Sequence, residues 1–168
     1  MLAQHPVTMY RQGAATTPAE RTIARIWNLT LDQITDLQPM AADLLRVLAW
    51  YAPEDIPTTL VDRLADPPAV NGAVGLLNAY SMITPDPGAG TLSVQRLVQA
   101  IARTPDPDDP HRTSQAINRA RERATDQLHA ALPAVWDMPH SWPAWRILLP
   151  HIATLTGYVP TDTETPTT

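Results

Sequence analysis

The 168-residue chain contains no cysteine and no lysine, and no apolar run approaches the ~20 residues that a membrane-crossing helix needs. The lack of cysteine excludes a disulfide framework and a thiolate metal site. Residues 1–10 also lack the basic start and the apolar core of a signal peptide. We therefore expect a cytoplasmic protein with no membrane partner.

Charge is also scarce, at 17% of residues, and the formal net charge is −5. This mildly acidic balance argues against a general polyanion binder. Apolar residues make up 44% of the chain, enough for a packed core. The length suits one domain, or a small domain with an appended helical piece.

Apolar residues at helical spacing predict several helices in residues 20–104. The first begins at Glu20, after a flexible arm of residues 1–19, and a second begins near Pro39 and ends before Pro53. A short third helix is expected after Ile56-Pro57, a fourth from Pro67, and a fifth at Arg96–Arg103. The residues expected on the buried face of the first helix are Ile23, Ile26, Trp27, Leu31 and Ile34.

A β-hairpin is predicted between the fourth and fifth helices. Residues 81–84 and 91–94 are partly β-branched, and they flank the turn-forming sequence PDPGAG. Helices followed by a hairpin are the order of a winged-helix domain. We predict such a domain for residues 20–104.

The rest of the chain predicts a linker and a helical pair. Residues 105–112 are rich in proline and aspartate, which favours a stiff, solvated linker. Residues 113–157 predict an antiparallel helical hairpin, with Trp142 and Trp145 at the interface of the pair, and residues 158–168 a disordered tail. The predicted fold class is mainly α: a winged-helix domain followed by an antiparallel helical pair.

No pattern indicates a metal site or a catalytic centre. The five histidines lack the spacing that places ligands on one helix face, and the acidic run at 106–109 lacks the glycine and distant glutamate of a calcium loop. Walker, G-x-G-x-x-G and G-x-S-x-G motifs are absent. We expect that this chain is not an enzyme and binds no cofactor by itself.

A winged-helix DNA-binding regulator is the alternative, and charge argues against it. The fourth helix, which would enter the major groove, contains no arginine, and neither does the hairpin loop. Arg119, Arg121 and Arg123 are clustered, but on a separate helix and interrupted by Glu122.

Several short segments, taken in order, are similar to a known family. They are TIARIWNL (22–29), LLRVLAWYAPEDIP (44–57), AYSMI (79–83), LSVQRLVQA (92–100) and WPAWRILLPH (142–151). The series resembles the region after the ATPase core in bacterial STAND signal-transduction NTPases of the NB-ARC type with C-terminal tetratricopeptide repeats.

This resemblance implies a regulatory role for an excised fragment of a larger protein. The winged helix of such proteins packs against the nucleotide-binding domain in the resting, ADP-bound form and rotates away on activation. The chain is then a non-catalytic module whose partners are its own nucleotide-binding and repeat domains. ADP and ATP bind in the parent protein, which forms a homo-oligomer when active.

The same resemblance implies two nucleotide-sensing residues. Family members commonly have the sequence VHRLV at the start of the fifth helix, where related receptors place a histidine against the ADP β-phosphate. Here the sequence is VQRLV (94–98), so Gln95 stands at the histidine position and Arg96 follows as a second contact. A glutamine amide donates a hydrogen bond but does not titrate. The alternative is that Gln95 simply faces solvent.

Docking on the nucleotide-binding domain needs side chains that remain after the core is filled. Trp50, Tyr51 and Tyr80 are the candidates, and burial in the core is the alternative for each. A further hypothesis is a scaffold whose helical pair recruits another protein through Trp142 and Trp145.

Overall fold

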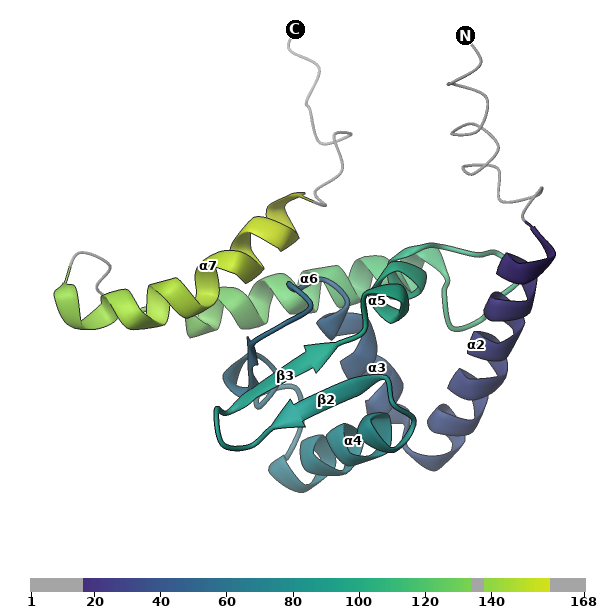
Figure 1. The fold of residues 1–168 in the computed structure, drawn as a ribbon, viewed down its shortest axis with the longest axis horizontal. Helices are drawn as coiled ribbons and strands as arrows, with labels where there is room; N and C mark the ends of the chain where they lie inside the picture. The colour runs from purple at the N-terminus through teal and green to yellow at the C-terminus, as the bar shows by residue number, and fades with distance from the viewer. Residues whose placement is uncertain (1–16, 134–137, 158–168) are drawn as a thin grey trace, which may run out of the picture.

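The computed structural model describes residues 17–133 and 138–157, which are mainly helical with one small antiparallel sheet (Figure 1). Of the arm predicted for residues 1–19, the part up to residue 16 lies outside the described residues, as does the predicted tail, while Pro18 and Ala19 already belong to the first helix, which corrects the predicted start at Glu20. The elements are α2 (Pro18–Leu37), α3 (Pro39–Leu48), β1 (Ile56–Pro57), η1 (Thr58–Leu60), α4 (Pro67–Ala79), β2 (Ile83–Asp86), β3 (Thr91–Val94), α5 (Arg96–Arg103), α6 (Ser114–Ala131), η2 (Pro139–Ser141) and α7 (Trp142–Gly157).

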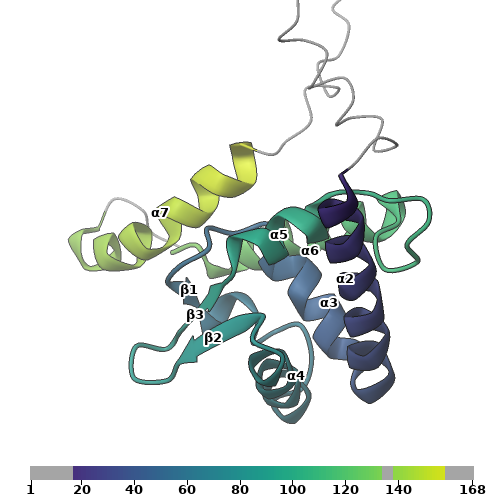
Figure 2. The ribbon, with the colours of Figure 1, turned by 45° about the vertical axis from the view of Figure 1, so that its right-hand side comes forward.

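Helix α3 is the centre of the fold, and it packs against α2, α4, α5 and α6 (Figure 2). Pro39 occupies its first turn, where the missing N–H costs nothing, as predicted. A helix with neighbours on several sides must be apolar over most of its surface. The buried residues of α3 are Ala41, Ala42, Leu44, Leu45, Val47 and Leu48.

Helix α2 is buried along only part of its length. Trp27, Leu31 and Ile34 reach the core as predicted, whereas Ile23 and Ile26 are exposed, which corrects their predicted burial. The spacing is helical throughout, but no described element covers the N-terminal half of the apolar face. Periodicity identifies an apolar face, and only the tertiary arrangement decides what covers it.

The short third helix predicted after Ile56-Pro57 is only a single turn of 3-10 helix, η1. The two residues before it form the short strand β1. Pro57 has extended backbone angles, and Ile56 pairs with Leu92 of β3. Pairing with β3 therefore holds the backbone extended up to Pro57, and the segment that follows makes only one helical turn, in which Leu60 is buried.

The hairpin is confirmed, and β1 adds a third strand to it. The strand order is β1-β3-β2 with antiparallel pairs, and Ile83 lies opposite Val94. Strand β2 extends to Asp86 and so includes Pro85, which was expected in the loop. Proline is tolerated there because β2 is an edge strand.

Residues 105–112, here called the Pro/Asp junction, are folded, which corrects the predicted solvated linker. Asp109 is only 2% exposed, and its Oδ2 accepts a hydrogen bond of 2.7 Å from Nε of Arg112, which is also buried. Nη2 of Arg112 lies 3.0 Å from Oδ2 of Asp106. Asp106 and Asp109, which the sequence suggested were solvated, are thus both bound to Arg112.

The Pro/Asp junction is also fixed to two helices. Nε2 of His111 lies 2.6 Å from Oδ1 of Asp32 in α2, and Nε of Arg46 in α3 donates to the carbonyl of His111 at 3.1 Å. The start of α6 follows directly, with Thr113 capping it through a bond from the Ala116 N–H. The junction therefore sets the position of α6 on the body.

Helices α6 and α7 run in opposite directions and extend beyond the sheet at one end (Figure 1). Helix α6 packs on α3, η1 and α7, and its buried residues are Ile117, Ala120, Ala124 and Leu128. The buried residues of α7 are Leu148, His151 and Leu155. Of the two tryptophans predicted at this interface, Trp142 is 52% exposed and Trp145 is half-buried. In the described part of the chain no helix has the length and apolar character to span a membrane.

The Pro/Asp junction gives a direct test of stability. We expect Arg112→Met to lower the free energy of unfolding by about 3–5 kcal/mol, because it leaves the buried Asp109 carboxylate without its partner. Urea unfolding at pH 7 measures this change.

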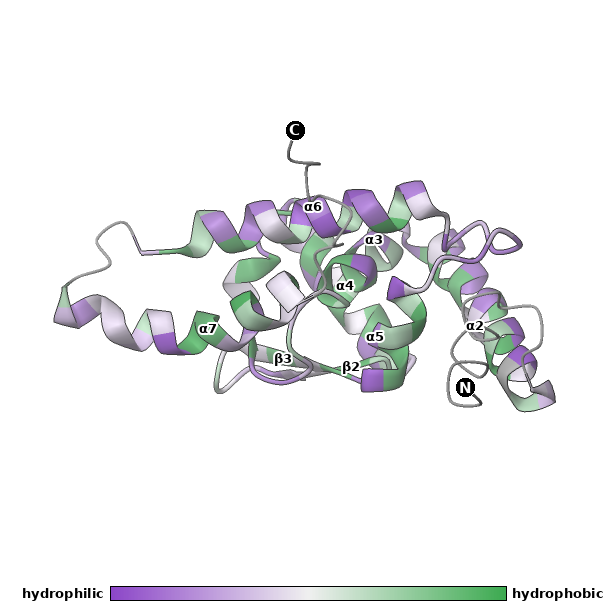
Figure 3. Ribbon diagram, turned by 90° about the horizontal axis from the view of Figure 1, so that it is seen from above, coloured by the Kyte–Doolittle hydropathy of each residue, from purple (hydrophilic) through white to green (hydrophobic). Residues whose placement is uncertain are grey.

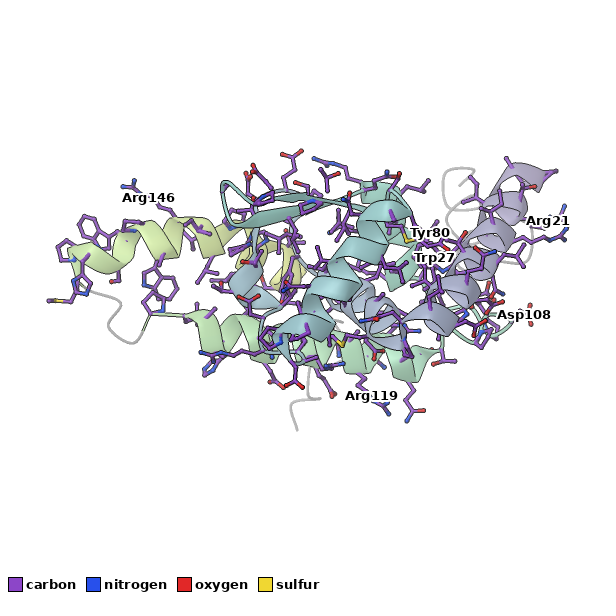
Figure 4. All side chains as sticks on the ribbon, turned by 90° about the horizontal axis from the view of Figure 1, so that it is seen from below. Arg21, Trp27, Tyr80, Asp108, Arg119 and Arg146 are labelled. Carbon is purple, nitrogen blue, oxygen red and sulfur yellow. The ribbon has the colours of Figure 1, made fainter. Side chains whose placement is uncertain are left out.

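The matched control is Asp108→Asn, at an exposed carboxylate of the same segment (Figure 4). Its effect should stay within about 0.5 kcal/mol. Equal effects of the two variants would contradict the structural role of the ion pairs.

Candidate functional site

The turn between α3 and β1, residues 49–55, is the point where α3, α5, α6 and α7 meet. The last carbonyl groups of a helix have no partner within the helix. Here Nε2 of the buried Gln99 donates to the carbonyls of Leu48 and Tyr51 at 3.2 and 2.9 Å, and Nη1 of Arg103 donates to that of Ala49 at 2.6 Å. Helix α5 is thereby attached to the end of α3.

Tyr51 connects this turn to α6 and α7. Its side chain is fully buried, and its hydroxyl donates to the carbonyl of Ala124 in α6 at 2.7 Å. Its ring meets that of His151 edge to face, with centroids 5.8 Å apart. Burial raises the pKa of the Tyr51 hydroxyl, so the group remains a donor.

His151 holds α7 against the same turn. Nδ1 accepts the Ala52 N–H at 3.2 Å, and Nε2 lies 3.0 Å from the carbonyl of Asp55, so the two bonds require a neutral ring with its proton on Nε2. Burial lowers the pKa of His151, against the opposing effects of the bond to Asp55 and of its charge. The backbone of Asp55 is left-handed, with φ of 56°.

A groove of about 550 Å³ opens beside this joint, and it is here called the α7 groove. Arg96 of α5 and Arg146 of α7 line it together with the acidic residues Glu54 and Asp55. Neither arginine has a hydrogen bond or ion pair within residues 17–133 and 138–157, and Figure 4 shows Arg146 extending from α7 on the side of the hairpin. The volume is that of a site for a small molecule or a short peptide segment. The remaining lining residues are Ala52, Pro53, Thr91, Ile147, Pro150 and His151.

Gln95 and Arg96, the two predicted nucleotide-sensing residues, have different surroundings. Nε2 of Gln95 donates to the carbonyl of Ser81 at 2.6 Å, in the turn where Ser81 has a φ of 60°. Gln95 is exposed, but its side chain is not only in contact with solvent, because this hydrogen bond connects the start of α5 to the turn after α4. Only Arg96 lines the α7 groove.

Two of the three aromatic residues that were predicted to dock on another domain belong to the core. This corrects the prediction that their side chains remain accessible. Trp50 and Tyr51 are buried, and the guanidinium of Arg121 lies 6.0 Å from the Trp50 ring centre. Tyr80 is half-buried, with its hydroxyl 3.4 Å from Oε1 of Gln33 (Figure 4). The two rings follow the end of α3 and fill the space between α3 and the C-terminal helices.

The large apolar side chains that remain uncovered lie elsewhere. Ile26 is 58% exposed on α2, and Leu97 is 57% exposed on α5. Sequence reasoning missed this surface because it assigned every periodic apolar residue to the core. One signal in the sequence could have revealed it: α2 has more apolar positions than a helix with one buried face needs.

Metal and nucleic-acid chemistry have little support in the described residues. No group of three histidine or acidic side chains could hold a metal ion in this part of the chain. The exposed positions of α4 include Pro68, Asn71 and Asn78, and none of its residues is charged.

Comparisons with protein-family models, with curated proteins and with solved structures found no match to this chain. Support for a function therefore comes from the sequence and the geometry.

The His151 joint predicts a pH dependence of stability. Because burial lowers the pKa of His151, the unfolded chain binds a proton more readily than the folded chain. Stability is thus fully present above the ordinary histidine pKa, near 6.5, and falls as the pH falls below it. Urea unfolding between pH 7.5 and 5.5 measures the slope, which one proton limits to about 1.4 kcal/mol per pH unit.

His151→Gln keeps a donor and an acceptor but does not titrate, so the slope should become smaller. His129→Gln, at an exposed histidine of α6, is the control and should leave the slope unchanged. A wild-type slope that His151→Gln does not change would contradict this prediction.

Proposed function

We propose that this chain is a non-catalytic regulatory module of a STAND NTPase of the NB-ARC type. In this proposal residues 20–104 form a winged helix, and α6 and α7 form the connector to a repeat array. The succession of helices, the following hairpin and the β1-β3-β2 strand order support the winged-helix assignment.

The exposed apolar surface of α2 and α5 is the observation that favours docking on another domain. Ile23, Ile26 and Leu29 are exposed on α2, and Leu97 is exposed on α5. Covering a half-exposed isoleucine or leucine contributes roughly 1 kcal/mol, so together these residues support a contact that one conformational change can break. The proposed occupant is the nucleotide-binding domain of the same protein.

The nucleotide of the parent protein, ADP or ATP, would then lie near the start of α5. Arg96 offers a guanidinium with no ion pair in the described residues, and such a group is suited to phosphate. Gln95 supports this region by tying α5 to α4 through the Ser81 carbonyl. In the proposal Gln95 positions Arg96, and Arg96 makes the direct contact with the nucleotide.

The Pro/Asp junction supports the relay of sensor state. Because it is bound to α2 through His111 and Asp32, and to α3 through Arg46, it is a rigid connection and not a loose tether. A displacement of α6 would thus be transmitted to α2, the helix that has the proposed docking surface.

The docking proposal is tested with the nucleotide-binding core of the parent protein. Addition of this chain should slow the release of fluorescent ADP from that core. Ile26→Glu or Leu97→Glu should weaken the binding at least about tenfold, because each places a charge in an apolar contact.

Leu37→Glu is the matched control, since Leu37 is also exposed but lies at the other end of α2. If the wild-type chain neither binds the core nor changes ADP release, the proposal fails. Flanking coding sequence with an upstream Walker motif and downstream repeats of about 34 residues would support it independently.

The alternative of a DNA-binding regulator predicts sequence-selective retention of duplex DNA in a gel-shift assay. Since α4 has no charged residue, we expect no such retention, even at low salt. Selective retention that Asn71→Ala abolishes would favour this alternative.

One observation favours a second function, the recruitment of another protein by the helical pair. Trp142 and Leu149 are each about half exposed on α7, and Figure 3 shows green, hydrophobic segments of this helix interrupted by pale and purple ones. The indole N–H of Trp145 is buried and has no hydrogen-bond acceptor among the described residues. A pull-down that depends on both Trp142 and Trp145 would support this function.

A further inference from the structure

A second, smaller cavity of about 140 Å³ lies between α3 and α6. Figure 4 shows Arg119 extending from α6 on the side of the molecule opposite to Arg146, so this cavity is separate from the α7 groove. Three arginines of the chain line it, two from α6 and one from α3. The lining residues are Asp43, Arg46, Val47, Ala116, Arg119, Ala120 and Arg123.

Positive charge at this cavity exceeds negative charge. Asp43 is the only acidic lining residue, and its Oδ1 is bound to Nη1 of Arg46 at 2.9 Å. Arg119 and Arg123 have no hydrogen bond or ion pair in the part of the chain that the structure describes. Nη2 of Arg46 likewise has no acceptor there, so each arginine has donors to offer a ligand.

This arrangement is unfavourable for the protein alone. Arg119 and Arg123 are one turn apart on the same helix face, where like charges repel. Arg46 is mostly buried, and burial lowers the pKa of its guanidinium despite the nearby Asp43 and Asp109. Arg121, between the other two on α6, lies instead over the Trp50 ring. An anion in the cavity would relieve the repulsion and replace lost solvation.

The size of the cavity limits the ligand. A drug-sized molecule needs about 300–1,000 Å³, whereas this cavity has the volume of roughly five water molecules. A nucleotide or a peptide does not fit inside it, but a phosphate group does. Guanidinium groups bind phosphate oxygens with two parallel hydrogen bonds, which favours this anion over a halide.

We propose that Arg46, Arg119 and Arg123 form a binding site for one phosphate group, held between α3 and α6. The bound group can be free phosphate or the phosphate of a monoester, because both present the same oxygens. It bridges the central helix of the body and the first helix of the connector. Binding therefore stabilises the packed position of α6.

Titration with inorganic phosphate and, separately, with phosphothreonine tests the site. Ionic strength is held constant with sodium chloride, and both the thermal unfolding midpoint and the side-chain ¹⁵N resonances of arginine are followed. We expect a saturable rise of the midpoint with phosphate, since a ligand that binds only the folded state stabilises it. The double variant Arg119→Gln/Arg123→Gln should lose this rise, with a Kd at least about tenfold weaker for each arginine.

The matched control is Arg21→Gln/Arg25→Gln. These arginines have the same spacing on α2 and are exposed, so the control removes the same charge away from any described cavity. Retention of the phosphate response in the control, and its loss in the cavity variant, supports the site.

The two probes identify the source of the phosphate group. Saturable binding of phosphothreonine alone indicates a monoester ligand such as a phosphorylated side chain, and binding of inorganic phosphate alone indicates the free ion. Saturable binding of both supports a site that recognises the phosphate group itself from either source. A response that chloride reproduces, or that both double variants lose equally, would overturn the proposal.

Discussion

The fold depends on how the backbone of the α3–β1 turn is satisfied. Helix α3 ends inside the protein, where its last carbonyls have no water to bind. Gln99 and Arg103 of α5 donate to these carbonyls, and His151 of α7 bonds to both Ala52 and Asp55. Tyr51, within the turn, donates in return to α6. Because these bonds join α5, α6 and α7 to one turn, the three C-terminal helices and the helical core form one unit.

The Pro/Asp junction shows how polar residues can also enforce a tertiary position. A buried ion pair gives little net stability compared with apolar packing, but losing one partner is costly. Arg112 satisfies both Asp106 and Asp109, and the backbone of the same segment bonds to Arg46. The junction thus specifies one placement of α6, which a flexible linker would not do.

With the interior filled in this way, the proposed functions depend on what is left uncovered. Apolar side chains on α2 and α5 lie on the surface, arginines line two separate cavities, and α4 has a neutral outer face. Apolar contact is suited to a reversible domain interface, and unpaired guanidinium groups are suited to phosphate. The proposed docking contact on α2 and α5 and the proposed phosphate site between α3 and α6 therefore involve different residues and can be tested separately.

The sequence by itself determined the mainly helical class, the hairpin and the limits of most helices, because local spacing, proline and turn residues act over a few positions. Helix α5, for example, has the predicted bounds Arg96–Arg103. Only the tertiary structure decided that Trp50 and Tyr51 are core, that Ile26 is exposed, and that residues 56–60 form a strand and a 3-10 turn. These outcomes depend on partners far along the chain: β3 holds Ile56 extended, and α6 and α7 cover Tyr51. Periodicity reports the character of a face, whereas burial and charge pairing are set by what meets that face in space.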